Sequence, residues 1–167
     1  MSITFVTTTS YGTWPPGDLR GYVRKRVVLP GNPKLFAHSR RLMKGKPVYF
    51  TVSERDRLFE SLQAGCAEFA YRLSDAAIES WHLHWIVWHG DDSIETVVGR
   101  LKTCMRQALS RGRIWTEGFC GEPLFDDSGV ERAQEYIAGH EGCCMTDGRV
   151  VVRPRVLTGR TPGRAGG

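Results

Sequence analysis

The sequence predicts an α+β fold, a ferredoxin-like antiparallel sheet with helices packed on one face. The segments follow the order strand, long loop, helix, strand, strand, helix, short strand, helix, which suits such a sheet. Apolar residues alternate in the short β-branched segments and recur at helical spacing in the longer ones. The length of 167 residues, with 41% hydrophobic and 25% charged residues, fits one domain. We expect this domain to cover residues 1–148 and a basic, disordered tail to cover residues 149–167.

The first half of the chain contains one clear strand and one clear helix. Residues 2–9 (SITFVTTT) are β-branched and aromatic, which is typical of a strand. The Gly- and Pro-rich stretch that follows begins a long basic loop over residues 10–50, in which residues 47–52 could pair as a minor strand. Ser53 is an N-cap candidate, and the apolar spacing after it predicts a helix over residues 53–72.

The second half predicts the remaining strands and helices. Residues 75–88 alternate in a way that indicates two strands joined by a bend at Ser80–Trp81. Ser93 begins the next helix, which Gly112 ends. Two short elements complete the pattern: a strand at 121–127 and a helix at about 129–141, capped by Asp127 or Ser128.

Positive charge is concentrated in two segments that contain no acidic residue, residues 20–46 and 149–167. The net charge of the chain is +5. A solvated surface would explain these segments, but their clustering favours contacts with the phosphates of a nucleic acid. The candidate contacts are basic residues of the loop and of the helix that Ser93 begins: Arg24, Lys25, Arg26, Arg40, Arg41, Lys102 and Arg106. Trp14, in the same loop, is a candidate for base stacking, whereas Trp85, Trp88 and Trp115 are expected in the core.

Other features narrow the class of protein. The five cysteines include no C-x-x-C pair, so neither a disulfide framework nor a zinc ribbon is indicated. No apolar stretch approaches the roughly 20 residues that span a bilayer, and the N-terminal residues lack a secretory pattern. We therefore expect a cytoplasmic protein without a membrane partner, associated with the nucleoid when bound to DNA.

The stretch WHLHWIVW at residues 81–88 places two histidines in an apolar strand. Because side chains alternate across a strand, His82 and His84 project from the same face. Each buried imidazole needs a partner, either a core hydrogen bond or a metal ion. On the last predicted helix, Tyr136 and His140 lie one turn apart. His140 would complete a three-imidazole metal site and place the Tyr136 hydroxyl beside it.

The pattern of two histidines around a hydrophobic residue, followed by a helix with Y-I-x-x-ligand, resembles the single-tyrosine HUH transposases. It is most similar to those associated with repetitive extragenic palindromes. The IWTEGF and EPLFDD stretches before the tyrosine helix add to the resemblance, which covers residues 2–9 and 53–141. Two positions depart from the family pattern: Ser80–Trp81 replaces a Pro-Asn turn, and His140–Glu141 replaces an Asn-Pro end.

The resemblance implies an HUH endonuclease-like domain that cleaves and rejoins single-stranded DNA through a 5′-phosphotyrosine. Tyr136 corresponds to the nucleophile, His82 and His84 to the HUH histidines, and His140 to the third ligand. The implied substrate is a hairpin or palindromic single strand, and a homodimer would supply a second active site. Three nitrogen ligands suit Mn²⁺, Zn²⁺ or Co²⁺, and abundant Mg²⁺ is an alternative.

Three other functions compete with the transposase. A replication-initiator-type HUH nickase would use the same site on a plasmid or viral origin. A non-catalytic nucleic-acid-binding module would use the histidines to hold a structural zinc, but would have no need of a phenol beside the metal. A metal-dependent hydrolase would activate water with a carboxylate, for which the last helix offers Glu135 or Glu141.

Overall fold

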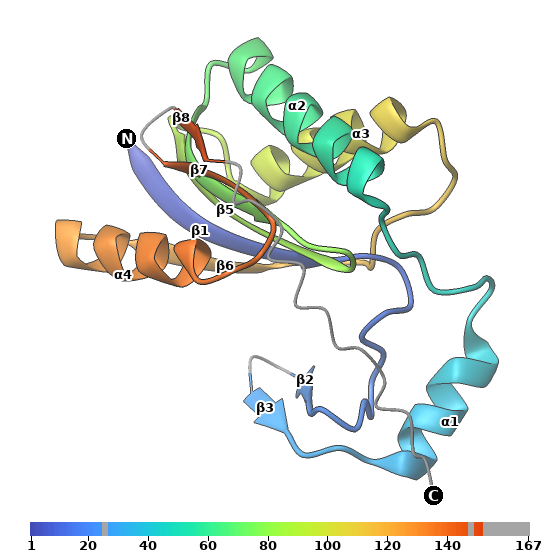
Figure 1. The fold of residues 1–167 in the computed structure, drawn as a ribbon. Coiled ribbons are helices and arrows are strands. Elements are labelled where there is room, and N and C mark those ends of the chain that lie inside the picture. The colour runs from blue at the N-terminus through green and yellow to red at the C-terminus, as the bar shows by residue number, and fades with distance from the viewer. Residues whose placement is uncertain (25–26, 147–148, 152–167) are drawn as a thin grey trace, which may run out of the picture.

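Six antiparallel strands form the central sheet, in the order β6-β1-β5-β4-β7-β8 (Figure 1). The computed structural model describes residues 1–24, 27–146 and 149–151. Its elements are β1 (Ser2–Thr9), β2 (Tyr22–Arg24), β3 (Val27–Leu29), α1 (Pro33–Leu42), α2 (Val52–Glu68), β4 (Arg72–Ile78), β5 (His82–His89), α3 (Ile94–Leu109), β6 (Cys120–Leu124), α4 (Asp127–Ala138), β7 (Cys143–Thr146) and β8 (Arg149–Val151). The predicted α+β fold with an antiparallel sheet is confirmed.

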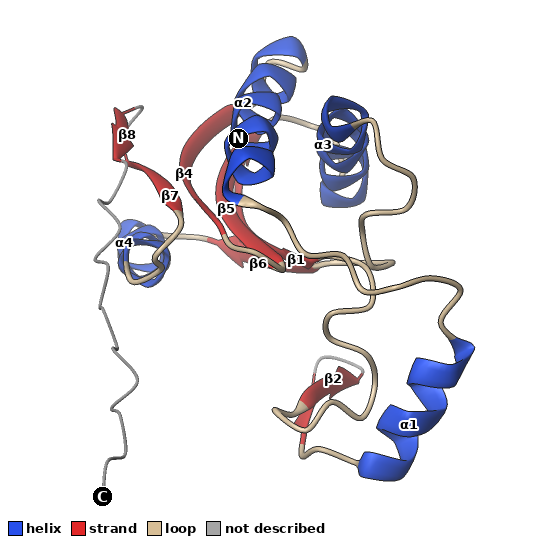
Figure 2. Ribbon diagram, turned by 45° about the vertical axis from the view of Figure 1, so that its right-hand side comes forward, coloured by secondary structure: helices blue, strands red, loops and turns tan. Residues whose placement is uncertain are grey.

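Both faces of the sheet are covered by helices (Figure 2). Residues such as Leu83 and Trp85 of β5 pack in the main core with α2 and α3. Ile86 of β5 packs on the opposite face, against Ala133 and Ile137 of α4. Helices on a single face were expected, and α4 departs from that arrangement. The reason lies in β5, whose apolar residues occupy both of its alternating positions, so that each face needs a cover.

Helix α4 begins and ends earlier than its sequence pattern predicted. The Asp126 carboxylate caps the N-terminus by accepting from the Gly129 N–H at 2.7 Å. Gly139 is the C-cap, so His140 lies just beyond the helix. The backbone N–H of His140 still donates to the Ile137 carbonyl at 3.0 Å. This bond continues the helical turn and keeps His140 on the side of Tyr136.

The segment of residues 10–50 contains structure of its own, the β2–β3 hairpin and α1, and lies beyond one end of the central sheet (Figure 1). Residues 47–52 do not form the expected strand. Val48 instead donates one backbone bond to Tyr11, and Phe50 donates one to Ser80. These bonds tie the end of the segment to the sheet before α2 begins at Val52.

Helix α2 is capped by Thr51 rather than by Ser53, through a capping box with Glu54. At the C-terminal end, residues 149–151 form β8 and pair with β7, so the expected disordered tail is wrong for these residues. Residues 152–167 lie outside the described part of the chain. Among the described helices, none combines the length and hydropathy needed to cross a membrane.

Candidate metal and nucleophile site

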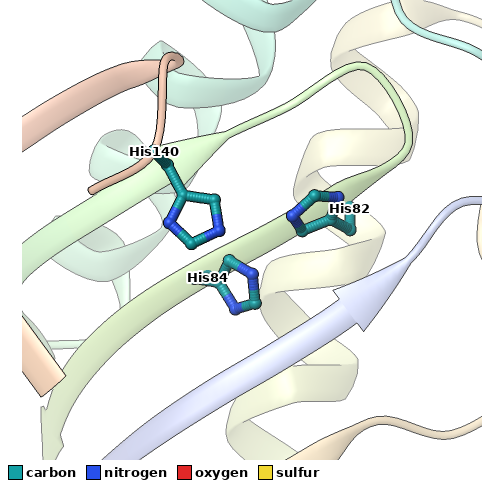
Figure 3. A group of neighbouring side chains, drawn as sticks. All are labelled: His82, His84 and His140. Carbon is teal, nitrogen blue, oxygen red and sulfur yellow. The ribbon is translucent and has the colours of Figure 1, made fainter. Parts of the chain in front are cut away.

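Three imidazoles meet on the α4 face of the sheet (Figure 3). His82 and His84 come from β5, and His140 comes from the turn after α4. The ring centroids are 4.8 Å apart for His82 and His84, 4.6 Å for His84 and His140, and 5.5 Å for His82 and His140. One nitrogen from each ring lies within 4.8 Å of the other two. The strand spacing and the helical offset thus bring the three predicted residues together.

Neighbouring groups orient two of these rings. The Thr7 hydroxyl lies 2.8 Å from Nδ1 of His84. Nδ1–H of His140 donates to the backbone carbonyl of Tyr136 at 2.9 Å. Such a bond fixes the tautomer in which Nε2 of His140 carries the lone pair, as is usual for metal-binding histidines.

Two ring nitrogens of the cluster are buried without a hydrogen-bond partner among the described residues, Nδ1 of His82 and Nε2 of His84. A buried polar atom in this state costs about 1–3 kcal/mol, so it is normally satisfied by ordered water or by a ligand. A divalent cation would satisfy both atoms. At a metal–nitrogen distance of about 2.1 Å the donors would stand about 3–4 Å apart, so binding would draw the rings slightly together.

The electrostatics of the site also suit a cation. Burial, reinforced by the charge on His140 and then by that on Arg20, lowers the pKa of His82 to about 4. Burial, followed by repulsion from His82 and His140, lowers the pKa of His84 to about 3. Both rings are therefore neutral at pH 7, and a neutral imidazole is the form that binds a metal. The three residues can hold a divalent ion, and the nitrogen ligands are compatible with Mn²⁺, Zn²⁺ or Co²⁺.

Tyr136 lies beside the histidines on α4. Its ring meets His84 edge-on at 5.1 Å, Phe5 at 5.8 Å and His140 at 4.9 Å. The residue is 53% exposed, so solvent and an incoming ligand can reach its side chain. Buried Ile137 anchors the helix to the sheet and sets this orientation.

A second contact, two residues before Tyr136, holds α4 in place. The amide of Gln134 donates to Asp75 of β4 at 2.8 Å. Asp75 is buried and also accepts from Ser74 at 2.7 Å. This polar link joins the helix that carries Tyr136 to the strand next to the histidines, and so fixes its position along the sheet.

Sequence reasoning missed two residues that border the site, Trp81 and Arg20. The Trp81 ring lies against His82 with centroids 4.1 Å apart, and the Arg20 guanidinium lies 4.7 Å from the centroid of Trp81. Asp18 holds Arg20 through an ion pair of 2.8 Å, and Arg20 also donates to the Thr13 carbonyl. The position of Trp81 directly before His82 was the available signal. Arg20 is 61 residues away from it, and no local pattern links the two.

The predicted nucleic-acid contacts lie in different parts of the molecule. Arg24, Arg40 and Arg41 are exposed on β2 and α1 of the 10–50 segment, whereas Lys25 and Arg26 fall outside the described residues. The half-buried Trp14 ring donates to the Gly21 carbonyl and contacts Trp81 edge-on at 6.2 Å.

Two of the predicted contacts lie on α3, which covers the face of the sheet opposite the histidines. Arg106 is exposed there. The ammonium of Lys102 donates to the carbonyls of Thr116 and Gly118, and burial lowers its pKa to about 8. Lys102 therefore holds the loop after α3. Trp85 and Trp115 pack in the core as expected.

The fold of this chain is similar to that of a solved structure, which comparison with known proteins identified. No family model matches the chain, and no curated protein matches it. Among solved structures, it is similar to a REP-associated tyrosine transposase bound to a REP hairpin, with a TM-score of 0.53 and 12% identity. The match covers 81% of this chain and 64% of that one. A candidate transposase from Deinococcus radiodurans matches with a TM-score of 0.44 and 12% identity, over 83% of this chain and 90% of that protein. The resemblance predicted from the sequence is thus confirmed at the level of the fold.

Proposed function

We propose that the protein is a metal-dependent transposase that cleaves and rejoins single-stranded DNA through a 5′-phosphotyrosine at Tyr136. One observation carries the proposal: a half-exposed phenol contacts two of three clustered imidazoles, and two of the three rings have buried nitrogens without a partner among the described residues. A structural metal site has no use for such a phenol. The likeness of the fold to a REP-associated tyrosine transposase supports the same function.

In the proposed reaction the Tyr136 oxygen attacks the scissile phosphorus, and the bond from phosphorus to the 3′-oxygen of the preceding nucleotide breaks. The phenol proton passes to solvent, which reaches the half-exposed ring, and the departing 3′-oxygen takes up a proton. A divalent ion held by His82, His84 and His140 would polarise the phosphoryl oxygens and orient the phosphate. Attack by a 3′-hydroxyl on the phosphotyrosine reverses these steps and joins two strands.

The proposed cofactor is Mg²⁺ or Mn²⁺, and Zn²⁺ or Co²⁺ also fits the nitrogen ligands. The proposed substrate is a single strand beside a hairpin or palindrome. Because each chain carries one Tyr136, exchange of two strands needs either a second subunit or two successive reactions. Arg24, Arg40 and Arg41 would contact the phosphate backbone away from the site.

The test is covalent capture. The protein is incubated with Mn²⁺ and a labelled single strand that carries a hairpin, and the denatured product is analysed by mass spectrometry. We expect an adduct with the mass of the protein plus the 3′-side fragment. Tyr136→Phe should bind the strand with wild-type affinity and form no adduct, and His82→Ala should form none through loss of the metal. Tyr49→Phe, on another exposed tyrosine, is the matched control and should react normally.

Each rival function gives a different result. Cleavage by Tyr136→Phe at the wild-type rate would make the protein a water-using hydrolase. Metal and DNA binding without cleavage would make it a non-catalytic module. A nickase and a transposase both form the adduct, and an added acceptor strand with a 3′-hydroxyl distinguishes them. A transposase transfers the bound fragment to an unrelated copy of the site. A nickase of a replication origin reseals its own strand.

A further inference from the structure

A groove of about 600 Å³ runs from Tyr136 between β6 and α4. These two elements lie side by side in Figure 1. Phe5, Leu124 and Ala133 supply its apolar lining. Phe5 also stacks on His84 with a centroid distance of 5.7 Å, so the groove and the histidine cluster share a wall. Its volume lies in the range of pockets that hold small ligands. A strand placed with its phosphate at Tyr136 would therefore pass directly into this groove.

The rim of the groove carries an aromatic ring and a cation. Phe125 follows β6 and is 91% exposed, an unusual position for a phenylalanine. Arg132 lies one helical turn before Tyr136, and His140 lies one turn after it. Four residues advance a helix by about 6 Å, so a cation, the nucleophile and a metal ligand follow one another along one side of α4 and of the turn after it. The Arg132 guanidinium donates to the Ser128 hydroxyl at 3.1 Å, towards the start of α4. On a DNA backbone that runs along α4 it would contact a phosphate next to the scissile one.

Two acidic residues also line the groove. Asp126 uses its carboxylate to cap α4, where it accepts from Gly129 and from Ser128. Glu122 is opposite Phe5 in the register of β6 and β1, so its side chain shares the α4 face. A carboxylate there repels phosphate and accepts hydrogen bonds from amino groups. Glu122 thus makes the β6 wall of the groove suited to a base, and Arg132 is the cation that the α4 side offers to the backbone.

We propose that this groove binds the base of a nucleotide that flanks the scissile phosphate, with Phe125 stacking on the base and Arg132 contacting the adjacent phosphate. The proposal rests on the proposed function of Tyr136. Glu122 accepts a hydrogen bond from the exocyclic amino group of the base, so the groove takes adenine, cytosine or guanine in preference to thymine. The groove is then a specificity site for the nucleotide next to the cut.

The experiment uses the full chain with Mn²⁺ and a pool of single strands that combine a hairpin with a randomised arm. Sequencing of the strands captured on Tyr136 and of the released fragments gives the base on each side of the cut. We expect thymine to be depleted at one of these two positions. Phe125→Ala should make the base composition there uniform, and Glu122→Gln should restore thymine to the level of the other bases. Tyr49→Ala, an exposed aromatic outside the groove, should leave the preference unchanged.

A binding measurement tests the stacking independently of cleavage. In a Tyr136→Phe background, replacing the flanking nucleotide by an abasic residue should weaken binding about 5- to 100-fold. Phe125→Ala should weaken binding of the intact strand by a similar factor. The Phe125→Ala variant should bind the abasic strand almost as tightly as the intact strand, because both changes remove the same contact. Absence of any adduct with the wild-type protein would overturn the proposed function and this inference with it. An adduct with no base preference beside the cut, or with a preference that Phe125→Ala leaves intact, would overturn the groove assignment alone.

Discussion

Burial of His84 should make the metal-free protein lose stability as the pH falls. The folded state holds the pKa of His84 at about 3, below its ordinary value of 6.5, chiefly because the ring is only 4% exposed. Between these two values the unfolded chain binds a proton that the folded chain does not, so acid favours unfolding. The contribution of His84 to stability is complete above about pH 6.5 and is lost progressively as the pH falls towards about 3. Near pH 4.5 the loss is about 3 kcal/mol, from roughly 1.4 kcal/mol per pH unit.

The comparison of wild type with His84→Gln isolates this effect. Urea unfolding at pH 7 and near pH 4.5, in the presence of a chelator, gives the free energy of unfolding of each protein. The acidic groups titrate in both proteins and cancel, so the wild type should lose about 3 kcal/mol more than the variant. Ile86→Val lowers stability on the same face without removing a titratable group and should retain the wild-type pH dependence. Equal losses in the wild type and His84→Gln would refute the argument.

Two further predictions concern the chain around the site. A methyl group at Gly142 would lie 2.5 Å from a carbonyl oxygen of β4, so Gly142→Ala should displace the turn that carries His140 and weaken Co²⁺ binding about tenfold or more in calorimetry. Gly99→Ala, where nothing lies within 4 Å of the added methyl, should bind Co²⁺ like the wild type, and equal affinities in the two variants would contradict the prediction. Replacing Arg24, Arg40 and Arg41 together by alanine should lower the slope of log affinity for single-stranded DNA against log salt by about 2, as measured by fluorescence anisotropy. An unchanged slope would show that these arginines are solvated surface residues without phosphate contacts.

Local periodicity was sufficient to predict most of the histidine cluster. The two-residue spacing of His82 and His84 fixes a common face once β5 is a strand, whatever surrounds it. The four-residue spacing of Tyr136 and His140 places them on one side of a helical turn, even though α4 ends at Ala138. Both relations depend on backbone geometry alone, so the sequence predicted them.

Long-range relations were not predictable in the same way. The sequence pattern of α4 identifies its apolar side but not the face of the sheet that it covers. The contact of Arg20 with Trp81 joins residues that are 61 positions apart. It depends on how the segment of residues 10–50 folds back to the start of β5. The position of Phe125 at the rim of a groove likewise depends on the distance between β6 and α4, which no spacing in the sequence encodes. The proposed base site therefore rests on the structure and not on a sequence pattern.

The same features that suit the histidine cluster to a cation lower the stability of the metal-free fold. Nδ1 of His82 and Nε2 of His84 have no partner within the described part of the chain, and both rings are held neutral by burial. A fold selected only for stability would place apolar side chains at these two strand positions. Such departures are expected at functional or strained sites. A bound ion would satisfy both nitrogens and stabilise the native state, so metal affinity and folding stability should be linked. The exposed Tyr136 beside the cluster favours a catalytic metal site over a purely structural one.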